Sequence, residues 1–182
     1  MKYLIRLIEE EDADFIITLR NNPKLNRHLN FTSSKVEDQI KWIKEYKLKE
    51  KNKEEFYFTI LENGFKKGLY RLYKINKVSF TIGSWIFDTC DNKNLPIMVD
   101  LIMADLGFYG LHKNILLFDI RKDNKKVIHY HSLKSPLQYF EDHLNNYYLI
   151  KSDNWEISKK NVVSFFNINM ADYEILKTTF KF

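Results

Sequence analysis

The amino-acid sequence predicts one α+β domain with a mixed, mostly antiparallel central sheet flanked by helices. Three observations support this prediction. Apolar residues recur at helical spacing near both ends of the chain, three consecutive β-rich segments separated by turn residues occupy its middle, and a further strand follows a long helix. Strands that are grouped together, rather than alternating regularly with helices, are typical of α+β domains.

The opening third of the chain predicts one strand and two helices. YLIRLI (3–8) is an apolar, β-branched run, and the segment 11–22 places apolar residues at helical spacing before a proline. A second helix is expected over residues 35–50. Ser34 followed by Glu37 has the spacing of a capping box, in which the two side chains satisfy free amides of the first turn.

The middle of the chain changes to β periodicity and then returns to a helix. Gly64 and Asn76 separate three segments rich in aromatic and β-branched residues, which predict an antiparallel meander. The helix that follows carries Pro96 in its first turn, where a missing N–H costs nothing. The next strand is apolar throughout, so we expect it to be covered on both faces and to pair in parallel across the helix. The predicted ranges are 55–63, 68–76 and 77–87 for the meander, 95–111 for the helix and 114–120 for the last strand.

The last third of the chain is less regular. A helix is expected over 124–133 and a strand over 146–152, with Pro136 interrupting the pattern between them. The segment 154–166 fits either a helix or a strand, and 171–180 predicts a short terminal helix. The single predicted domain, residues 1–182, thus has a core of about residues 3–150 and a C-terminal extension of about 151–182.

The composition is that of a globular protein. The chain has 182 residues, of which 45% are hydrophobic and 29% charged, so it is long enough to bury a core without staples. Its only cysteine, Cys90, forms no disulfide framework, which is typical of a reducing compartment. Arg6 interrupts the first apolar run, which excludes a signal peptide, and nothing approaches the ~20 apolar residues of a membrane span. We therefore expect a cytoplasmic protein with no membrane partner.

The net charge of +5 raises nucleic acid as a partner, but the distribution of charge disfavours it. Only five of the 29 basic residues are arginine, the side chain that best recognises phosphates and base edges. The lysines alternate with glutamates, as in EYKLKEKNKEE, which is typical of solvated helix faces.

Four stretches of the sequence, in their order along the chain, carry a family resemblance: LIRLIEEEDADFIITLRNN, SSKVEDQIKWI, IGSWIF and FYGLHKNILLFDIRKDNKKVIHYHSL. With the order of elements, they resemble the GCN5-related N-acetyltransferase (GNAT) superfamily over roughly residues 3–150. The resemblance is closest to the branch of ribosomal-protein alanine acetyltransferases and acetyltransferases of nucleotide-linked amino sugars. In that pattern a Tyr follows an Asn by six residues, as Tyr130 follows Asn124 here.

The resemblance implies an acyl-CoA-dependent N-acyltransferase with acetyl-CoA as the default donor and no metal. The acceptor amine would attack the thioester directly in a ternary complex. The implied acceptor is a nucleotide-linked amino sugar, and a protein N-terminus is the other choice within the branch. A catalytically inactive module that binds a ligand or a protein is the alternative, because the loop at 91–96, where the family binds the CoA diphosphate, contains no glycine.

Two residues are candidates for the chemistry. Acyl transfer needs an acceptor for the amine proton and a donor for the departing sulfur. The resemblance assigns the second role to the hydroxyl of Tyr130, and packing of its ring on the sheet is the alternative. Asp88, after the last strand of the meander, is the candidate base or water-binding residue, or it simply starts a turn. Cys90 lacks a partner that would make it a nucleophile.

The remaining candidates would bind the two substrates. By resemblance, the strand GSWIFD pairs with the pantetheine arm of the donor, and the start of the following helix with its diphosphate. Asn124 either caps its helix or contacts the pantetheine. An arginine in the wall of the acceptor pocket suits a phosphate or carboxylate, and an aromatic ring stacks on a base or sugar; ordinary surface and core positions are the alternatives. The donor candidates are Trp85, Ile86, Phe87, Asn94, Leu95 and Asn124, and the acceptor candidates are Arg20, His28 and Phe31.

His129 and His131 raise the question of a metal site. Residues two apart on a helix point to nearly opposite sides, unlike the i, i+4 pair of a zinc-binding helix. No cysteine or acid joins them at ligand spacing. We expect no metal, with one of the two histidines facing the substrate or solvent.

Overall fold

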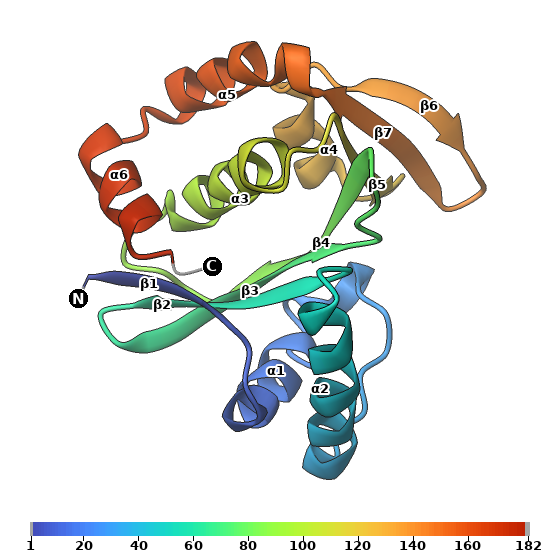
Figure 1. Cartoon of the computed structure of the whole chain (residues 1–182), viewed down its shortest axis with the longest axis vertical. Helices are drawn as coiled ribbons and strands as arrows, with labels where there is room; N and C mark the ends of the chain where they lie inside the picture. The colour runs from blue at the N-terminus through green and yellow to red at the C-terminus, as the bar shows by residue number, and fades with distance from the viewer. Residues whose placement is uncertain (1, 181–182) are drawn as a thin grey trace.

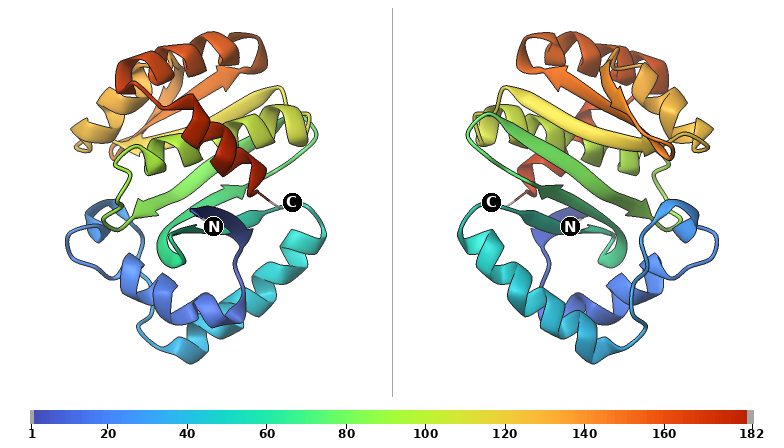
Figure 2. Two further views of the ribbon diagram at one scale, coloured as in Figure 1. Left: turned by 90° about the vertical axis from the view of Figure 1, so that its left-hand side faces the viewer. Right: turned by 90° about the vertical axis from the view of Figure 1, so that its right-hand side faces the viewer.

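One sheet separates two groups of helices in this protein (Figures 1 and 2). The computed structural model describes residues 2–180; within them, two helices cover one face of the sheet and four cover the other. The predicted α+β class is confirmed. The first face carries α1 (Ala13–Arg20) and α2 (Val36–Lys51), and the second carries α3 (Leu95–Asp105), α4 (Lys125–Ser132), α5 (Ser152–Phe166) and α6 (Met170–Thr178).

The sheet has seven strands in the order β1-β2-β3-β4-β5-β7-β6. All neighbouring strands are antiparallel except β4 and β5, which are parallel. The predicted meander and the predicted parallel pair across a helix are therefore confirmed. The strands are β1 (Tyr3–Leu7), β2 (Phe56–Glu62), β3 (Phe65–Tyr73), β4 (Ser79–Phe87), β5 (Ile115–Arg121), β6 (Leu137–Glu141) and β7 (Asn145–Lys151).

A two-residue turn joins the first two strands of the meander. Asn63 and Gly64 have φ values of 52° and 84°. Both residue types tolerate this left-handed region, which tight hairpin turns require. Because the turn closes at Gly64, β3 already begins at Phe65 rather than at residue 68 as predicted.

The start of α2 differs from its prediction. Lys35 is the N-cap residue, without a side-chain hydrogen bond, and the helix begins at Val36. Ser34 therefore precedes the N-cap, and its side chain does not bind the free amides of the first turn. The predicted capping box is wrong. The neighbouring Ser33 instead donates its hydroxyl to Asp38 at 2.6 Å.

The C-terminal extension is helical, and the strand before it was not predicted. The ambiguous segment 154–166 lies within α5. The sequence analysis missed β6 because all five of its residues are exposed, so no apolar alternation marks it. Met1 and residues 181–182, the ends of the predicted domain, lie outside the described residues.

Each face of the sheet has its own apolar core. Ile16 and Ile43 pack beneath the sheet with α1 and α2, whereas Phe80, Met98 and Trp155 belong to the larger core under the other helices. Nearly all residues of α3 are buried, so this helix lies inside the larger core. No helix, over the described part of the chain, is both long enough and apolar enough to cross a membrane.

The two parallel strands separate soon after they meet, and this separation positions the candidate site. Their pairing covers only Ser79–Thr81 on β4 and Ile115–Leu117 on β5. Further along β4, Ser84 has a φ of +49° and the register with β3 shifts, which is the geometry of a β-bulge. β5 instead stays paired with β7 along its length. The sheet is therefore split between β4 and β5 beyond Thr81.

Candidate active site

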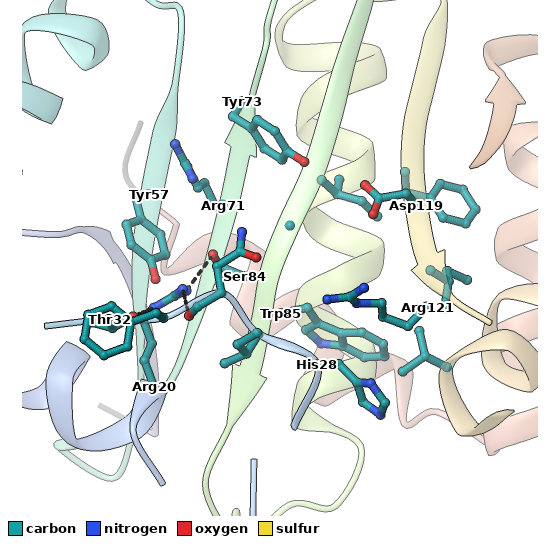
Figure 3. A pocket seen from close by; sticks show the side chains of 18 of the residues that line it. Arg20, His28, Thr32, Tyr57, Arg71, Tyr73, Ser84, Trp85, Asp119 and Arg121 are labelled. Carbon is teal, nitrogen blue, oxygen red and sulfur yellow. Dashed lines mark hydrogen bonds between the residues drawn. The ribbon is translucent and has the colours of Figure 1, made fainter. Parts of the chain in front are cut away.

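A cavity of about 790 Å³ opens at the split between β4 and β5 (Figure 3). Residues 82–85 line it from β4 and residues 118–121 from β5. The loop before α2, together with α1 to α4, supplies most of the rest. Polar groups and aromatic rings that are distant in the sequence thus meet in one space.

The cavity contains polar atoms that have no partner within the protein. Among residues 2–180, four buried side-chain polar atoms lack a hydrogen bond, and three of them belong to residues that line this cavity. They are Tyr57 Oη, His131 Nδ1 and Asn145 Oδ1; the fourth, Thr59 Oγ1, lies elsewhere. Buried polar groups are nearly always paired, because an unpaired one costs about 1–3 kcal/mol. Their concentration here indicates a site for a polar ligand.

The side chain of Arg20 connects three elements of the cavity wall by hydrogen bonds. Its Nε donates to Thr32 Oγ1 at 2.7 Å and its Nη1 donates to Ser84 Oγ at 3.2 Å, as Figure 3 shows. These bonds join α1 to the loop before α2 and to the bulge of β4. The predicted acceptor residues His28 and Phe31 also line the cavity, and the Phe31 ring is 94% exposed. The structure therefore brings all three predicted acceptor residues together.

Arg121 is a cation that the sequence analysis missed. It extends from β5 over the split, near Trp85 and His28 (Figure 3). Within residues 2–180 its guanidinium has neither a side-chain hydrogen bond nor an ion pair, whereas Arg71 on β3 donates to Glu55 at 2.5 Å. A free guanidinium beside unpaired polar atoms suits an anionic ligand.

Side chains along the strand that we predicted to bind the donor alternate between the two faces of the sheet. Trp85 and Phe87 pack on the α3 and α4 side of the sheet, and Ile86 packs on the opposite side with α1 and α2. Only Trp85 of the three lines the cavity. Its indole Nε1 donates to the carbonyl of Pro96 at 3.0 Å, so the ring connects β4 to the first turn of α3.

The loop before α3 already uses most of its backbone donors. The amides of Asp91 and Asn92 donate to the Glu62 carboxylate at 2.7 and 2.9 Å. The amides of Asn94 and Leu95 both donate to Asn92, at 2.9 Å each, and Pro96 has no N–H. These groups are thus not free to bind a diphosphate. Neither Asn94 nor Leu95 lines the main cavity. The side-chain amide of Asn94 donates to the Phe166 carbonyl at 3.1 Å, and Leu95 is buried in the core.

Asn124 is the N-cap residue of α4, which was one of its two predicted roles. Its Oδ1 accepts from the Val127 amide at 3.4 Å, and the residue also lines the cavity. The carboxylate of the preceding residue, Asp123, lies 3.3 Å from Arg27 Nη2 and 3.4 Å from His28 Nδ1.

Tyr130 is buried and its hydroxyl is engaged in the core. It donates to Asp100 Oδ2 at 2.5 Å, Tyr70 donates to Asp100 Oδ1 at 2.5 Å, and the Lys134 ammonium contacts the same carboxylate. Burial, reinforced by the carboxylate of Asp100, raises the pKa of Tyr130 well above its ordinary value. Asp100 lines the cavity but Tyr130 does not. Its role as the acid stays a prediction.

The next residue on α4, His131, faces the cavity instead. Its ring stacks on Phe118, with centroids 4.5 Å apart, and meets Trp85 edge-on at 5.9 Å. Burial and the charge of Lys134 lower the pKa of His131 to about 3, so the imidazole is neutral at neutral pH. His129, in contrast, is exposed. The sequence analysis expected one histidine to face the substrate or solvent but did not select His131, because the spacing does not show which side of α4 meets the split.

Asp88 lies outside the cavity, at the far end of β4. It is exposed, and its Oδ1 accepts from the Thr89 amide at 2.7 Å, within residues 88–90, which form neither a turn nor a bend. Cys90 nearby donates its thiol to the Asp88 carbonyl at 3.3 Å. Burial raises the pKa of this thiol to about 11, so the thiolate needed for nucleophilic chemistry is scarce at neutral pH.

Comparison with known proteins agrees with this geometry. A family model described as an acetyltransferase (GNAT) domain matches residues 2–131. The chain is 33% identical to the structure of apo FdhC, a nucleotide-linked sugar GNAT, with a TM-score of 0.79 over 90% of this chain and 94% of that one. No curated protein matches.

Two more distant structures share the fold. The N-acetyltransferase PseH of Campylobacter jejuni is 14% identical, with a TM-score of 0.63 over 84% of this chain and 99% of that chain. A variant of the spermidine N-acetyltransferase SpeG from Vibrio cholerae is 16% identical, with a TM-score of 0.66 over 85% and 96%.

Proposed function

Since the chain belongs to the GNAT family and is an N-acetyltransferase, we propose that it transfers an acetyl group from acetyl-CoA to the amine of a nucleotide-linked amino sugar. The observation that carries the choice of acceptor is the cavity at the split of the sheet, with its unpaired polar atoms and the free guanidinium of Arg121.

The cavity has the size and chemistry for such an acceptor. Its volume of about 790 Å³ lies within the usual range for a drug-sized ligand. Arg121 supplies a charge for a phosphate group, and the exposed ring of Phe31 supplies a surface on which a base or sugar can stack. The unpaired Tyr57 Oη and Asn145 Oδ1 can pair with sugar hydroxyls. FdhC, which is 33% identical to this chain, is a nucleotide-linked sugar GNAT, and this similarity supports an acceptor of the same class.

The split also supports the choice of donor. Beyond Thr81, the edge of β4 that faces β5 has no strand partner in the described chain. An extended arm with amide groups can pair with such an edge as an added strand does. The loop at 91–96 fits less well, because its amides already bind Glu62 and Asn92. We therefore place the pantetheine arm along β4 and give the diphosphate no contact with these amides.

Two measurements test the proposal in sequence. Titration with acetyl-CoA should raise the unfolding temperature, because a ligand that binds only the folded state stabilises it. Release of free thiol is then followed with three acceptor classes: nucleotide-linked amino sugars, peptides with a free N-terminus, and polyamines. We expect turnover with the first class, inhibited by the nucleoside diphosphate alone.

The outcomes separate the alternatives. Absence of any stabilisation by acetyl-CoA overturns the transferase and leaves the inactive binding module. Stabilisation with thiol release from peptides or polyamines, and none from nucleotide sugars, overturns only the proposed acceptor.

A further inference from the structure

We propose, on the basis of the function proposed above, that His131 is a catalytic residue that carries the proton from the attacking amine to the departing sulfur. The inference rests on the position of its imidazole at the split, on its unpaired buried nitrogen, and on the different positions of Tyr130, Asp88 and Asp119.

The position of His131 follows from two ring contacts. It stacks on Phe118, the first residue of β5 beyond the parallel pairing, and it meets Trp85 of β4 edge-on. The imidazole therefore bridges the two strands where they begin to separate. A thioester whose arm lies between these strands reaches its acceptor next to this ring.

The helix itself separates His131 from its neighbour. Successive residues of an α-helix point about 100° apart, so Tyr130 and His131 point in different directions. Tyr130 is directed at Asp100, between α3 and α4, and His131 at the cavity. The residue that meets the reacting groups is therefore the imidazole.

The unpaired nitrogen gives His131 a free position for a proton. Its Nδ1 is buried without a hydrogen-bond partner, and the side chain is only 4% exposed. Such a nitrogen is costly unless a ligand pairs with it. Burial, followed by the charge of Lys134, keeps the ring neutral, and the free Nδ1 of this neutral ring is the position that the geometry offers to a proton. Other charged groups in the lining of the cavity are Arg20, Asp38, Arg71, Asp119 and Arg121.

The step balances without another reactant. As the amine nitrogen bonds to the carbonyl carbon, it passes one proton to His131. As the bond from carbon to sulfur breaks, the imidazolium gives a proton to the thiolate. The products are the amide and the free thiol, and the imidazole is neutral again.

The other titratable groups fit this role less well. The hydroxyl of Tyr130 already donates to Asp100, and Asp88 lies outside the cavity. Asp119 also lines the cavity, but Figure 3 shows that its carboxylate points toward Tyr73 and not toward Trp85. It is the rival base that the experiment must include.

The experiment compares His131→Gln with the matched variant His129→Gln, which changes an exposed histidine on the same helix. We expect kcat for thiol release to fall by about 10²- to 10⁴-fold in His131→Gln, with KM for acetyl-CoA changed by less than about threefold. His129→Gln should keep the kcat of the wild type, and Asp119→Asn should lower kcat by clearly less than His131→Gln does. His131→Asn serves as the second variant if Gln disturbs folding, and thermal unfolding checks both.

Two further readouts distinguish catalysis from structural support. Added imidazole should restore part of the activity of His131→Ala but not alter His129→Ala. In the wild type, the ring-nitrogen resonance of His131, assigned with the variants, should shift when CoA and a nucleoside diphosphate are added together. This readout does not depend on turnover.

Each outcome has a separate meaning. A wild type without transferase activity overturns the proposed function. An active wild type with a fully active His131→Gln, or an inactive His131→Ala that imidazole does not restore, overturns the role of His131 alone. So does a loss of kcat in Asp119→Asn that equals the loss in His131→Gln, or a histidine resonance that ligands leave unchanged.

Discussion

Lys134 and Asp100 form an ion pair that is closed off from solvent between α3 and the end of α4. Their side chains are 0% and 1% exposed. The hydroxyls of Tyr70 and Tyr130 complete the hydrogen bonds of the carboxylate. Because a buried charge without a partner is very costly, each member of this cluster depends on the others. Asp100 also lines the cavity, so the cluster connects the core to the candidate active site.

Replacing Lys134 by Met should destabilise the fold by about 3–5 kcal/mol, because the Asp100 carboxylate would stay buried without its counter-charge. Urea unfolding measures the loss. Lys126→Met, on the exposed side of α4, should change stability by less than about 0.5 kcal/mol. The double variant Lys134→Met/Asp100→Asn should recover part of the loss, because it removes the unpaired charge, and equal losses in Lys126→Met and Lys134→Met would contradict this account.

Tyr130→Phe separates the two readings of this tyrosine. It removes a donor from a buried carboxylate, so we expect a loss of stability of about 1.5–3 kcal/mol. Thiol release should stay within about twofold of the wild type, because the hydroxyl belongs to the core cluster. If kcat instead fell by about a hundredfold, as the loss of a general acid would cause, and binding of acetyl-CoA were unchanged, Tyr130 would be the acid.

The stability of the protein should depend on pH through His131. Its pKa is lowered from 6.5 to about 3 in the folded state, so the unfolded chain binds an extra proton between these values. Stability is therefore fully present above pH 6.5 and falls as the pH drops toward 3, by about 2 kcal/mol between pH 7 and 5. Urea unfolding of His131→Gln should lack this contribution, whereas His129→Gln should keep it. Identical pH dependence in the two variants would refute the assignment.

Arg121→Gln tests the anion site. Because charge-assisted hydrogen bonds contribute about 1.5–3 kcal/mol, we expect KM for the nucleotide-linked acceptor to rise by roughly 10- to 100-fold. KM for acetyl-CoA should stay near that of the wild type. Arg27→Gln is the matched control, because Arg27 is exposed and forms its ion pair with Asp123, at 3.3 Å, outside the cavity lining. An unchanged acceptor KM in Arg121→Gln would remove Arg121 from the site.

Tyr57→Phe should affect stability and binding in different directions. The hydroxyl is buried without a partner, so its removal should leave stability unchanged or raise it by up to about 1 kcal/mol. Binding of the acceptor should weaken, because the hydroxyl is free to pair with it. Thermal unfolding and acceptor KM together check the prediction, and a large loss of stability would show that the hydroxyl already has a partner.

Most elements of the fold could be predicted because local periodicity determines them. The meander was predicted from its turn residues, and α3 from its apolar spacing and Pro96. The prediction failed where no local pattern exists, as in the wholly exposed β6, or where the chain path sets a boundary, as at Ser34. The resemblance also selected Arg20, His28 and Phe31, which the structure brings to one cavity.

The sequence by itself thus determined the fold class, the family resemblance and the helix that carries Tyr130 and His131. Only the tertiary structure decided which of the two lines the cavity. The reason is that the rotation of α4 about its axis depends on the buried contact of Tyr130 and Lys134 with Asp100, which lies about 30 residues away in the sequence. Spacing along one helix fixes the angle between two side chains, but not the direction in which either points.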